Sequence, residues 1–71
     1  MDKQKEVANL IRIMRLSKGY SQEYVATKMG ISQTAYSKIE RGITALSVRH
    51  IANLSRIFDV EAKTFLPSPS N

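Results

Sequence analysis

The spacing of glycine and serine is the feature that most constrains how this chain can fold. Glycine supplies the positive φ that commonly ends a helix, and serine at a helix start accepts a hydrogen bond from a free backbone N–H group. Three glycine–serine pairs each predict the end of one helix and the start of the next: Gly19 and Ser21, Gly30 and Ser32, and Gly42 and Ser47. None of these serines is followed three residues later by Glu or Gln, so we expect simple caps and no capping boxes.

Apolar residues between these signals recur every three or four positions, as they do along one face of a helix. No alternating run is long enough to indicate a β-strand. The pattern therefore predicts an all-α domain of five helices, at about 4–18, 22–29, 33–41, 48–58 and 61–66. The domain is expected to span residues 1–66, and the proline-containing segment 67–71, PSPSN, is expected to be a disordered C-terminal tail.

The composition excludes several classes of protein. The chain has 71 residues, enough for one domain with a modest core, and it has no cysteine, which excludes disulfides and thiolate zinc sites. His50 is the single histidine and has no acidic pair nearby, so we expect a surface position, no metal site and no cofactor. The acidic residues are scattered, with no nucleophile–base pair and no phosphate-binding glycine loop, so we expect no enzyme activity.

No membrane or export signal is present in the sequence. No apolar run approaches the roughly 20 residues of a membrane span. The N-terminus, MDKQKE, lacks the basic-then-apolar order of a signal peptide. We therefore expect a cytoplasmic protein that makes no membrane contact.

The charge favours a polyanionic partner, with nucleic acid as the first candidate. The formal net charge is +5 and the isoelectric point is about 9.9. The excess is concentrated between residues 10 and 41, where only Glu23 and Glu40 are acidic. The basic residues of this segment are Arg12, Arg15, Lys18, Lys28, Lys38 and Arg41.

The predicted helices 22–29 and 33–41 form the most informative motif. The link between them, GIS at 30–32, is short and contains glycine, which is the geometry of a helix-turn-helix. Ala26 is small where the two helices should cross, and Tyr36 and Ile39 are expected to seat the second helix on the core. In such a motif the second helix enters the major groove of DNA and its N-terminal residues meet base edges.

Polar residues of the second helix form one stripe at about 100° per residue. Its members are Gln33, Thr34, Ser37 and Lys38. Glutamine can bond N6 and N7 of adenine, and lysine can reach O6 or N7 of guanine. The stripe is therefore predicted to contact base pairs, and the alternative is a face that is polar only for solubility.

The segment YSQEYVATKMGISQTAYSKIERG resembles the Cro/C1-type helix-turn-helix of phage and bacterial regulators, also called the XRE family. The resemblance extends from about residue 7 to residue 66, and its specific part is S-Q, A, G, S-Q and I-E-x-G at the family spacing. It implies a compact five-helix, lambda-repressor-like domain. It also implies a bacterial or phage-encoded repressor or controller protein, which binds a palindromic operator in double-stranded DNA as a homodimer.

The resemblance also implies roles for individual residues. Base contacts fall on Gln33, Thr34, Ser37 and Lys38, and phosphate contacts fall on Gln22, Ser32, Lys18, Arg41 and Thr44. The loop of Thr44, ITAL, lacks a basic residue, which argues against a reach into the minor groove. Leu46 stands where the family often has a proline before the fourth helix. Arg15 and Glu40 stand where the family has a structural salt bridge, and the rival role for Arg15 is a phosphate contact.

Two further features leave alternatives open. Leu10, Ile13 and Leu16 lie on a second side of the first helix, where they either pack on the fifth helix or form an apolar face for a protein partner. The alternative function is accordingly an antitoxin or adaptor-type interaction module with the same fold. Tyr36 replaces the aliphatic residue that the family usually has, and we expect it in the core with its hydroxyl reaching an edge.

Overall fold

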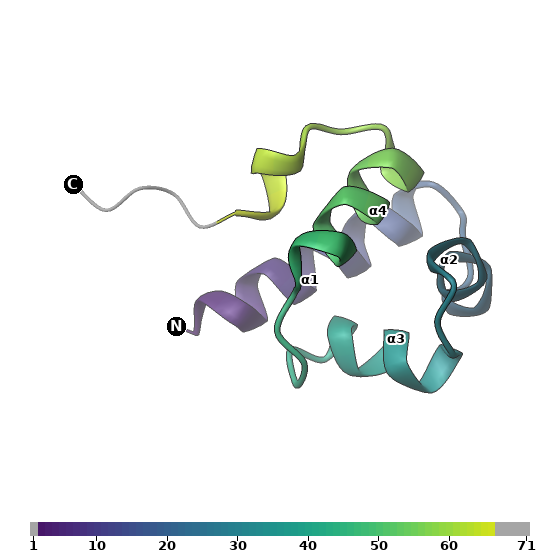
Figure 1. Cartoon of the computed structure of the whole chain (residues 1–71), viewed down its shortest axis with the longest axis horizontal. Helices are drawn as coiled ribbons and strands as arrows, with labels where there is room; N and C mark the ends of the chain where they lie inside the picture. The colour runs from purple at the N-terminus through teal and green to yellow at the C-terminus, as the bar shows by residue number, and fades with distance from the viewer. Residues whose placement is uncertain (1, 67–71) are drawn as a thin grey trace.

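The computed structural model describes residues 2–66, which contain four α-helices and one 3₁₀-helix and no β-strand (Figure 1). The elements are α1 (Lys3–Ser17), α2 (Gln22–Met29), α3 (Gln33–Glu40), α4 (Val48–Phe58) and η1 (Ala62–Phe65). The expected tail 67–71 lies outside the described residues. The four α-helices begin and end within one residue of the predicted bounds, because the residues that set those bounds act locally: serine or Asp2 at the starts, and glycine or Asp59 at or near the ends.

The prediction of a fifth α-helix was wrong. η1 is a single 3₁₀ turn, in which the N–H groups of Thr64 and Leu66 donate to the carbonyls of Glu61 and Lys63 at 3.0 and 3.1 Å. Leu66 then adopts an extended backbone, which suits the residue before a proline. The turn still closes the core, because Phe65 is buried.

The expectation of simple caps was wrong at α4. The Ser21 and Ser32 hydroxyls each accept one backbone N–H at 3.0 Å, as expected. Ser47, however, forms a reciprocal capping box with His50: its hydroxyl accepts from His50 N at 3.1 Å, and its own N–H donates to His50 Nδ1 at 3.3 Å. An imidazole nitrogen here replaces the Glu or Gln oxygen of the usual box.

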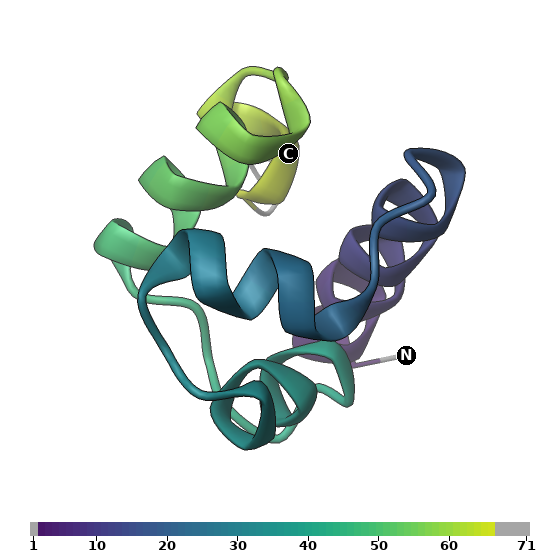
Figure 2. The ribbon, with the colours of Figure 1, turned by 90° about the vertical axis from the view of Figure 1, so that its right-hand side faces the viewer.

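Every element contributes to one apolar core. α2 packs against both α3 and α4, α1 packs against α3, and η1 packs against α4 (Figure 2). The largest fully buried side chains are Tyr36, Phe58, Phe65, Ile11, Leu54 and Val25. α2 lies between α3 and α4, so α3 is at the edge of the helical arrangement (Figure 2).

The loop after α3 is held against the start of α1. Gly42 has φ +74°, and a Cβ placed on it would lie 2.8 Å from Lys5 Cγ and 3.2 Å from Lys5 Cα. Gln4 Nε2 donates to the Gly42 carbonyl at 2.6 Å across the same contact. The exit of α3 is therefore fixed to α1 by a close backbone approach and a hydrogen bond.

This close approach predicts that Gly42→Ala destabilises the fold more than Gly30→Ala. Both glycines have nearly the same positive φ, so both variants should lose about 1–2 kcal/mol from backbone strain. Only Gly42 has atoms within 4 Å of the added methyl, so its variant should lose roughly 1–3 kcal/mol more from overpacking. Urea unfolding of the two variants measures the difference, and equal losses would mean that α1 moves aside without cost.

Candidate nucleic-acid interface

A three-residue turn sets α3 against α2. Gly30 ends α2 in the left-handed conformation, and Ile31 N–H donates to the Ala26 carbonyl at 3.0 Å. Ser32 then starts α3 by accepting from Ala35 N–H. These local bonds fix the angle between the two helices, as a helix-turn-helix requires.

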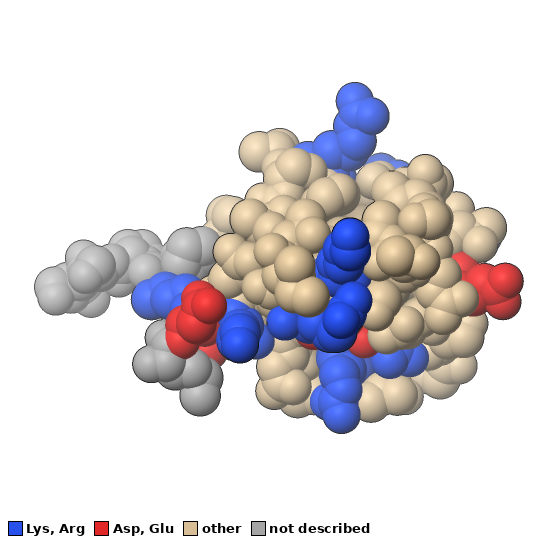
Figure 3. Space-filling view, turned by 90° about the horizontal axis from the view of Figure 1, so that it is seen from below, with Lys and Arg blue, Asp and Glu red and all other residues tan. Residues whose placement is uncertain are grey.

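The polar stripe of α3 faces outward. Gln33, Thr34 and Lys38 are exposed and Ser37 is half-buried, whereas Tyr36 and Ile39 are in the core. Figure 3 views the side of the molecule on which α3 lies. Lys and Arg side chains gather near the middle of this face. Most of the visible Asp and Glu surface lies toward its two ends. A helix with exposed donors and acceptors on a basic face has the chemistry to meet an anionic groove.

The residues predicted to contact phosphate do not all lie beside this stripe. Ser32 and Arg41 flank α3 directly, and Thr44 is exposed in the following loop, where its N–H donates to the Lys38 carbonyl at 3.3 Å. Lys18 is not brought beside α3. It caps the C-terminal end of α1, which lies away from α3 in both ribbon views (Figures 1 and 2).

Glu40 is the only buried charged residue within residues 2–66, with 7% of its surface exposed. Arg15 donates to both carboxylate oxygens, from Nε to Oε2 at 2.5 Å and from Nη2 to Oε1 at 3.1 Å. Tyr36 donates its hydroxyl to Oε2 at 2.5 Å, and Gln22 Nε2 donates to Oε1 at 3.1 Å. The carboxylate thus joins side chains from α1, α2 and α3.

The Arg15 guanidinium is committed to the protein interior. Its Nη1 donates to the Tyr20 carbonyl at 2.9 Å, and only 11% of the Arg15 side-chain surface is exposed. The rival role of Arg15 as a phosphate contact does not fit this geometry. A bidentate pair of this kind fixes the orientation of both partners.

Burial and these hydrogen bonds shift the pKa values of Glu40, Arg15 and Tyr36. Burial alone would raise the pKa of the Glu40 carboxyl, but hydrogen bonds from Arg15, Tyr36 and Gln22 outweigh it and hold this pKa below its ordinary value of 4.5. The hydrogen bond to Glu40 raises the pKa of Arg15, and burial raises the pKa of the Tyr36 hydroxyl. The network therefore contains a carboxylate and a guanidinium at neutral pH.

Two members of this network were missed by the sequence reasoning. The Tyr36 hydroxyl was expected at an edge, but it is fully buried on Glu40, and the four-residue spacing of the two on one helix is a signal for such a contact. Gln22 was predicted to contact phosphate only. No local pattern indicates its bond to Glu40, since the two residues are 18 positions apart.

Residues 2–66 contain no cluster of three or more His, Cys, Asp or Glu side chains that could hold a metal ion. None of the helices in this range combines the length and the apolar character that crossing a membrane requires.

Comparison with known proteins gives three consistent matches. The helix-turn-helix family model matches residues 11–65. The HTH-type transcriptional regulator SlrR of Bacillus subtilis (strain 168) is 39% identical over 56 residues, which make up 78% of this chain and only 37% of SlrR. The crystal structure of the restriction-modification controller protein C.AhdI from Aeromonas hydrophila superposes with a TM-score of 0.82 and 27% identity, over 89% of this chain and 96% of that one.

The lowered pKa of Glu40 predicts an acid-sensitive fold. Because the unfolded chain binds the Glu40 proton more readily than the folded chain, the contribution of Glu40 to stability is fully present above about pH 4.5. It is lost as the pH falls through the folded-state pKa. Glu40→Gln should be less stable than wild type at pH 7, and its free energy of unfolding should fall less between about pH 5 and pH 3. Urea unfolding across this range tests the prediction, and parallel pH profiles would contradict it.

Proposed function

The chain belongs to the helix-turn-helix family, and we propose that it is a sequence-specific DNA-binding transcriptional regulator that reads an operator in the major groove through α3. The observation that carries this proposal is the outward polar stripe of α3, Gln33, Thr34, Ser37 and Lys38, on a basic face. The names of SlrR, a transcriptional regulator, and C.AhdI, a restriction-modification controller, support a repressor or controller role. Both relatives come from bacteria, which supports a bacterial or phage-encoded cytoplasmic protein.

In this proposal, different residues of the motif contact the bases and the phosphates. The stripe of α3 reads base edges, because its side chains are exposed on the helix that such motifs insert into the groove. Ser32 and Arg41, at the two ends of α3, contact phosphates on either side of the groove, and Gln22 does so from the start of α2. Lys18 and Thr44 are more peripheral members of the phosphate set, since they lie on the loops.

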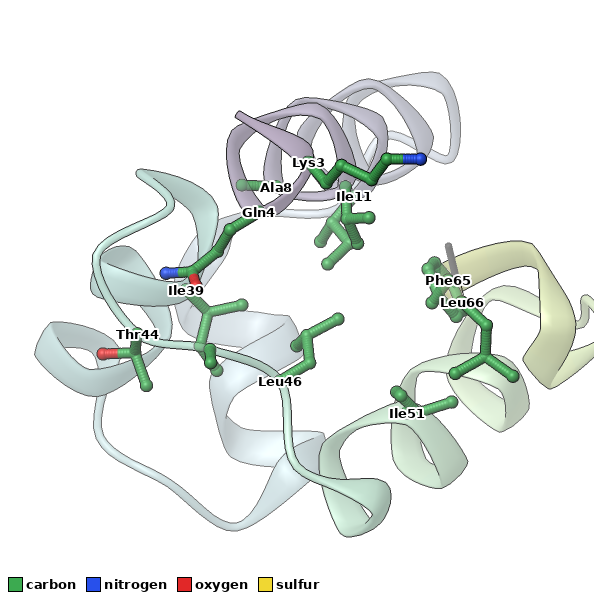
Figure 4. Close-up of a pocket in the computed structure, with 12 residues that line it drawn as sticks. Lys3, Gln4, Ala8, Ile11, Ile39, Thr44, Leu46, Ile51, Phe65 and Leu66 are labelled. Carbon is green, nitrogen blue, oxygen red and sulfur yellow. The ribbon is translucent and has the colours of Figure 1, made fainter. Parts of the chain in front are cut away.

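An apolar groove of about 290 Å³ supports action as a homodimer. Side chains from α1, α3, α4 and η1 point toward one another around it: Ile11, Ile39, Ile51 and Phe65 (Figure 4). Leu66 lines the same groove and is 50% exposed. A two-fold dimer buries the same patch of both subunits, and an apolar groove lined by the exposed Leu66 offers such a patch.

Exposed apolar residues on α1 support a second candidate function, binding of a protein partner. Ile13 and Leu16 on α1 are 50% and 53% exposed, so η1 does not cover them, and Leu10 beside them is half-buried. Exposed apolar side chains grouped on one helix face can bind another protein. We therefore keep an antitoxin or adaptor-type module, with a partner at this face of α1, as the alternative.

Selection of bound sites from a randomised duplex pool tests the proposed function. A dimeric regulator should select a palindrome whose half-sites lie about 34 Å apart, and its affinity should fall steeply with salt. A consensus without two-fold symmetry would contradict the dimer and retain the base readout. Binding without any consensus would remove the base readout and favour the alternative module.

Gln33→Ala should lose base discrimination. If Gln33 contacts a base, the variant loses roughly 1–3 kcal/mol on the selected site and tolerates any base at one position. Gln22→Ala is the matched control, because removal of a phosphate contact weakens binding to all sequences alike. Competition titrations with single-position variants of the site measure both effects. A uniform loss for Gln33→Ala would reassign that residue to the DNA backbone.

A further inference from the structure

Glu40 has no acceptor capacity left over. A carboxylate offers about two lone pairs on each oxygen, and each oxygen here receives two donors. Oε2 accepts from Arg15 Nε and the Tyr36 hydroxyl, and Oε1 accepts from Arg15 Nη2 and Gln22 Nε2. Arg15 neutralises the charge and Tyr36 fills the core, but Gln22 does neither.

The bond to Glu40 determines how Gln22 presents its amide. A glutamine amide has an oxygen end and a nitrogen end, and only the nitrogen end can donate to a phosphate. Donation to Glu40 at 3.1 Å fixes the position of Nε2 and uses one of its two N–H groups. The second N–H remains, on a half-buried residue that begins α2.

The same arrangement keeps a buried carboxylate compatible with a nearby phosphate. An unpaired Glu40 would repel an anion, but the bidentate Arg15 guanidinium cancels its charge. The group behind Gln22 is therefore an ion pair with no net charge. Since Glu40 is the last residue of α3, the bond also ties the position of Gln22 to the helix that carries the base-reading stripe.

We propose that Glu40 is a positioning residue for DNA binding, which holds the Gln22 amide so that its second N–H faces a backbone phosphate. The proposal rests on the proposed function, since it assigns a role within the same DNA contact. Glu40 itself touches no DNA. Its effect on binding passes through Gln22 and is the same for every DNA sequence.

A triple-substitution background separates positioning from folding. Arg15→Met, Glu40→Leu and Tyr36→Phe together replace the buried pair and the hydroxyl bonded to it by apolar side chains and leave the net charge unchanged. Such replacements often preserve stability. In wild type, Gln22→Ala should weaken operator binding about tenfold, as loss of a charge-assisted hydrogen bond does. In the Arg15→Met/Glu40→Leu/Tyr36→Phe background, the same change should cost less than about twofold, because Gln22 is no longer held.

Tyr36→Phe is the matched control. It removes another donor to Glu40 and leaves the Gln22 bond in place, so Gln22→Ala should still cost about tenfold in that background. An equal penalty for Gln22→Ala in all three backgrounds, with operator binding intact, would overturn the positioning role. Failure of wild type to select any duplex would instead overturn the proposed function, and the positioning role with it.

A measurement on the free wild-type protein needs no variant to fold. ¹⁵N relaxation of the Gln22 side-chain amide should show it as rigid as the backbone of α2, whereas the exposed Gln33 amide should be mobile. Equal mobility of the two amides would overturn the proposal, because Gln22 would then not be held before DNA arrives.

Discussion

Burial of the Glu40 carboxylate is the constraint on which the arrangement of the first three helices depends. A charge with 7% exposure is tolerable only when its hydrogen bonds are complete, and the donors come from Arg15 on α1, Gln22 on α2 and Tyr36 on α3. Displacement of any one of these helices would leave a buried polar group without a partner. By contrast, α4 and η1 contribute apolar side chains to the core and none to this network. The polar network thus orients the helix-turn-helix relative to α1, and apolar packing holds the remainder.

Most of the fold could be predicted from the sequence, because its boundaries are set locally. Ser21, Ser32 and Ser47 act within three residues of themselves, and the glycines end helices by their own backbone conformation. The two errors had different causes. His50 closes a capping box that is normally recognised by Glu or Gln, and the segment around Phe65 has apolar residues at helical spacing but is too short for more than a 3₁₀ turn.

The candidate site was predictable only in part. The exposure of Gln33, Thr34 and Lys38 follows from the helical period, because Tyr36 and Ile39 must face the core. The pairing of Arg15 with Glu40, 25 residues apart, came from the family resemblance and not from spacing. The hydrogen bond from Gln22 to Glu40 could not be predicted from the sequence, because it depends on how three helices pack together. Contacts within one helix can be predicted from the helical period of the sequence, whereas contacts between helices can be identified only in the structure.

The bond between Gln4 and Gly42 makes the two ends of α3 depend on contacts of different sequence range. The start of α3 is fixed by bonds within the adjoining turn, which can form as soon as α2 and α3 exist. Its exit has local bonds as well, from the N–H groups of Gly42 and Ile43 to carbonyls of α3, but it is also tied to α1 by a contact that spans 38 residues of chain. Closure of so long a loop carries an entropy cost. The C-terminal end of α3 is therefore coupled to the position of α1, whereas its N-terminal end depends only on residues of the adjoining turn.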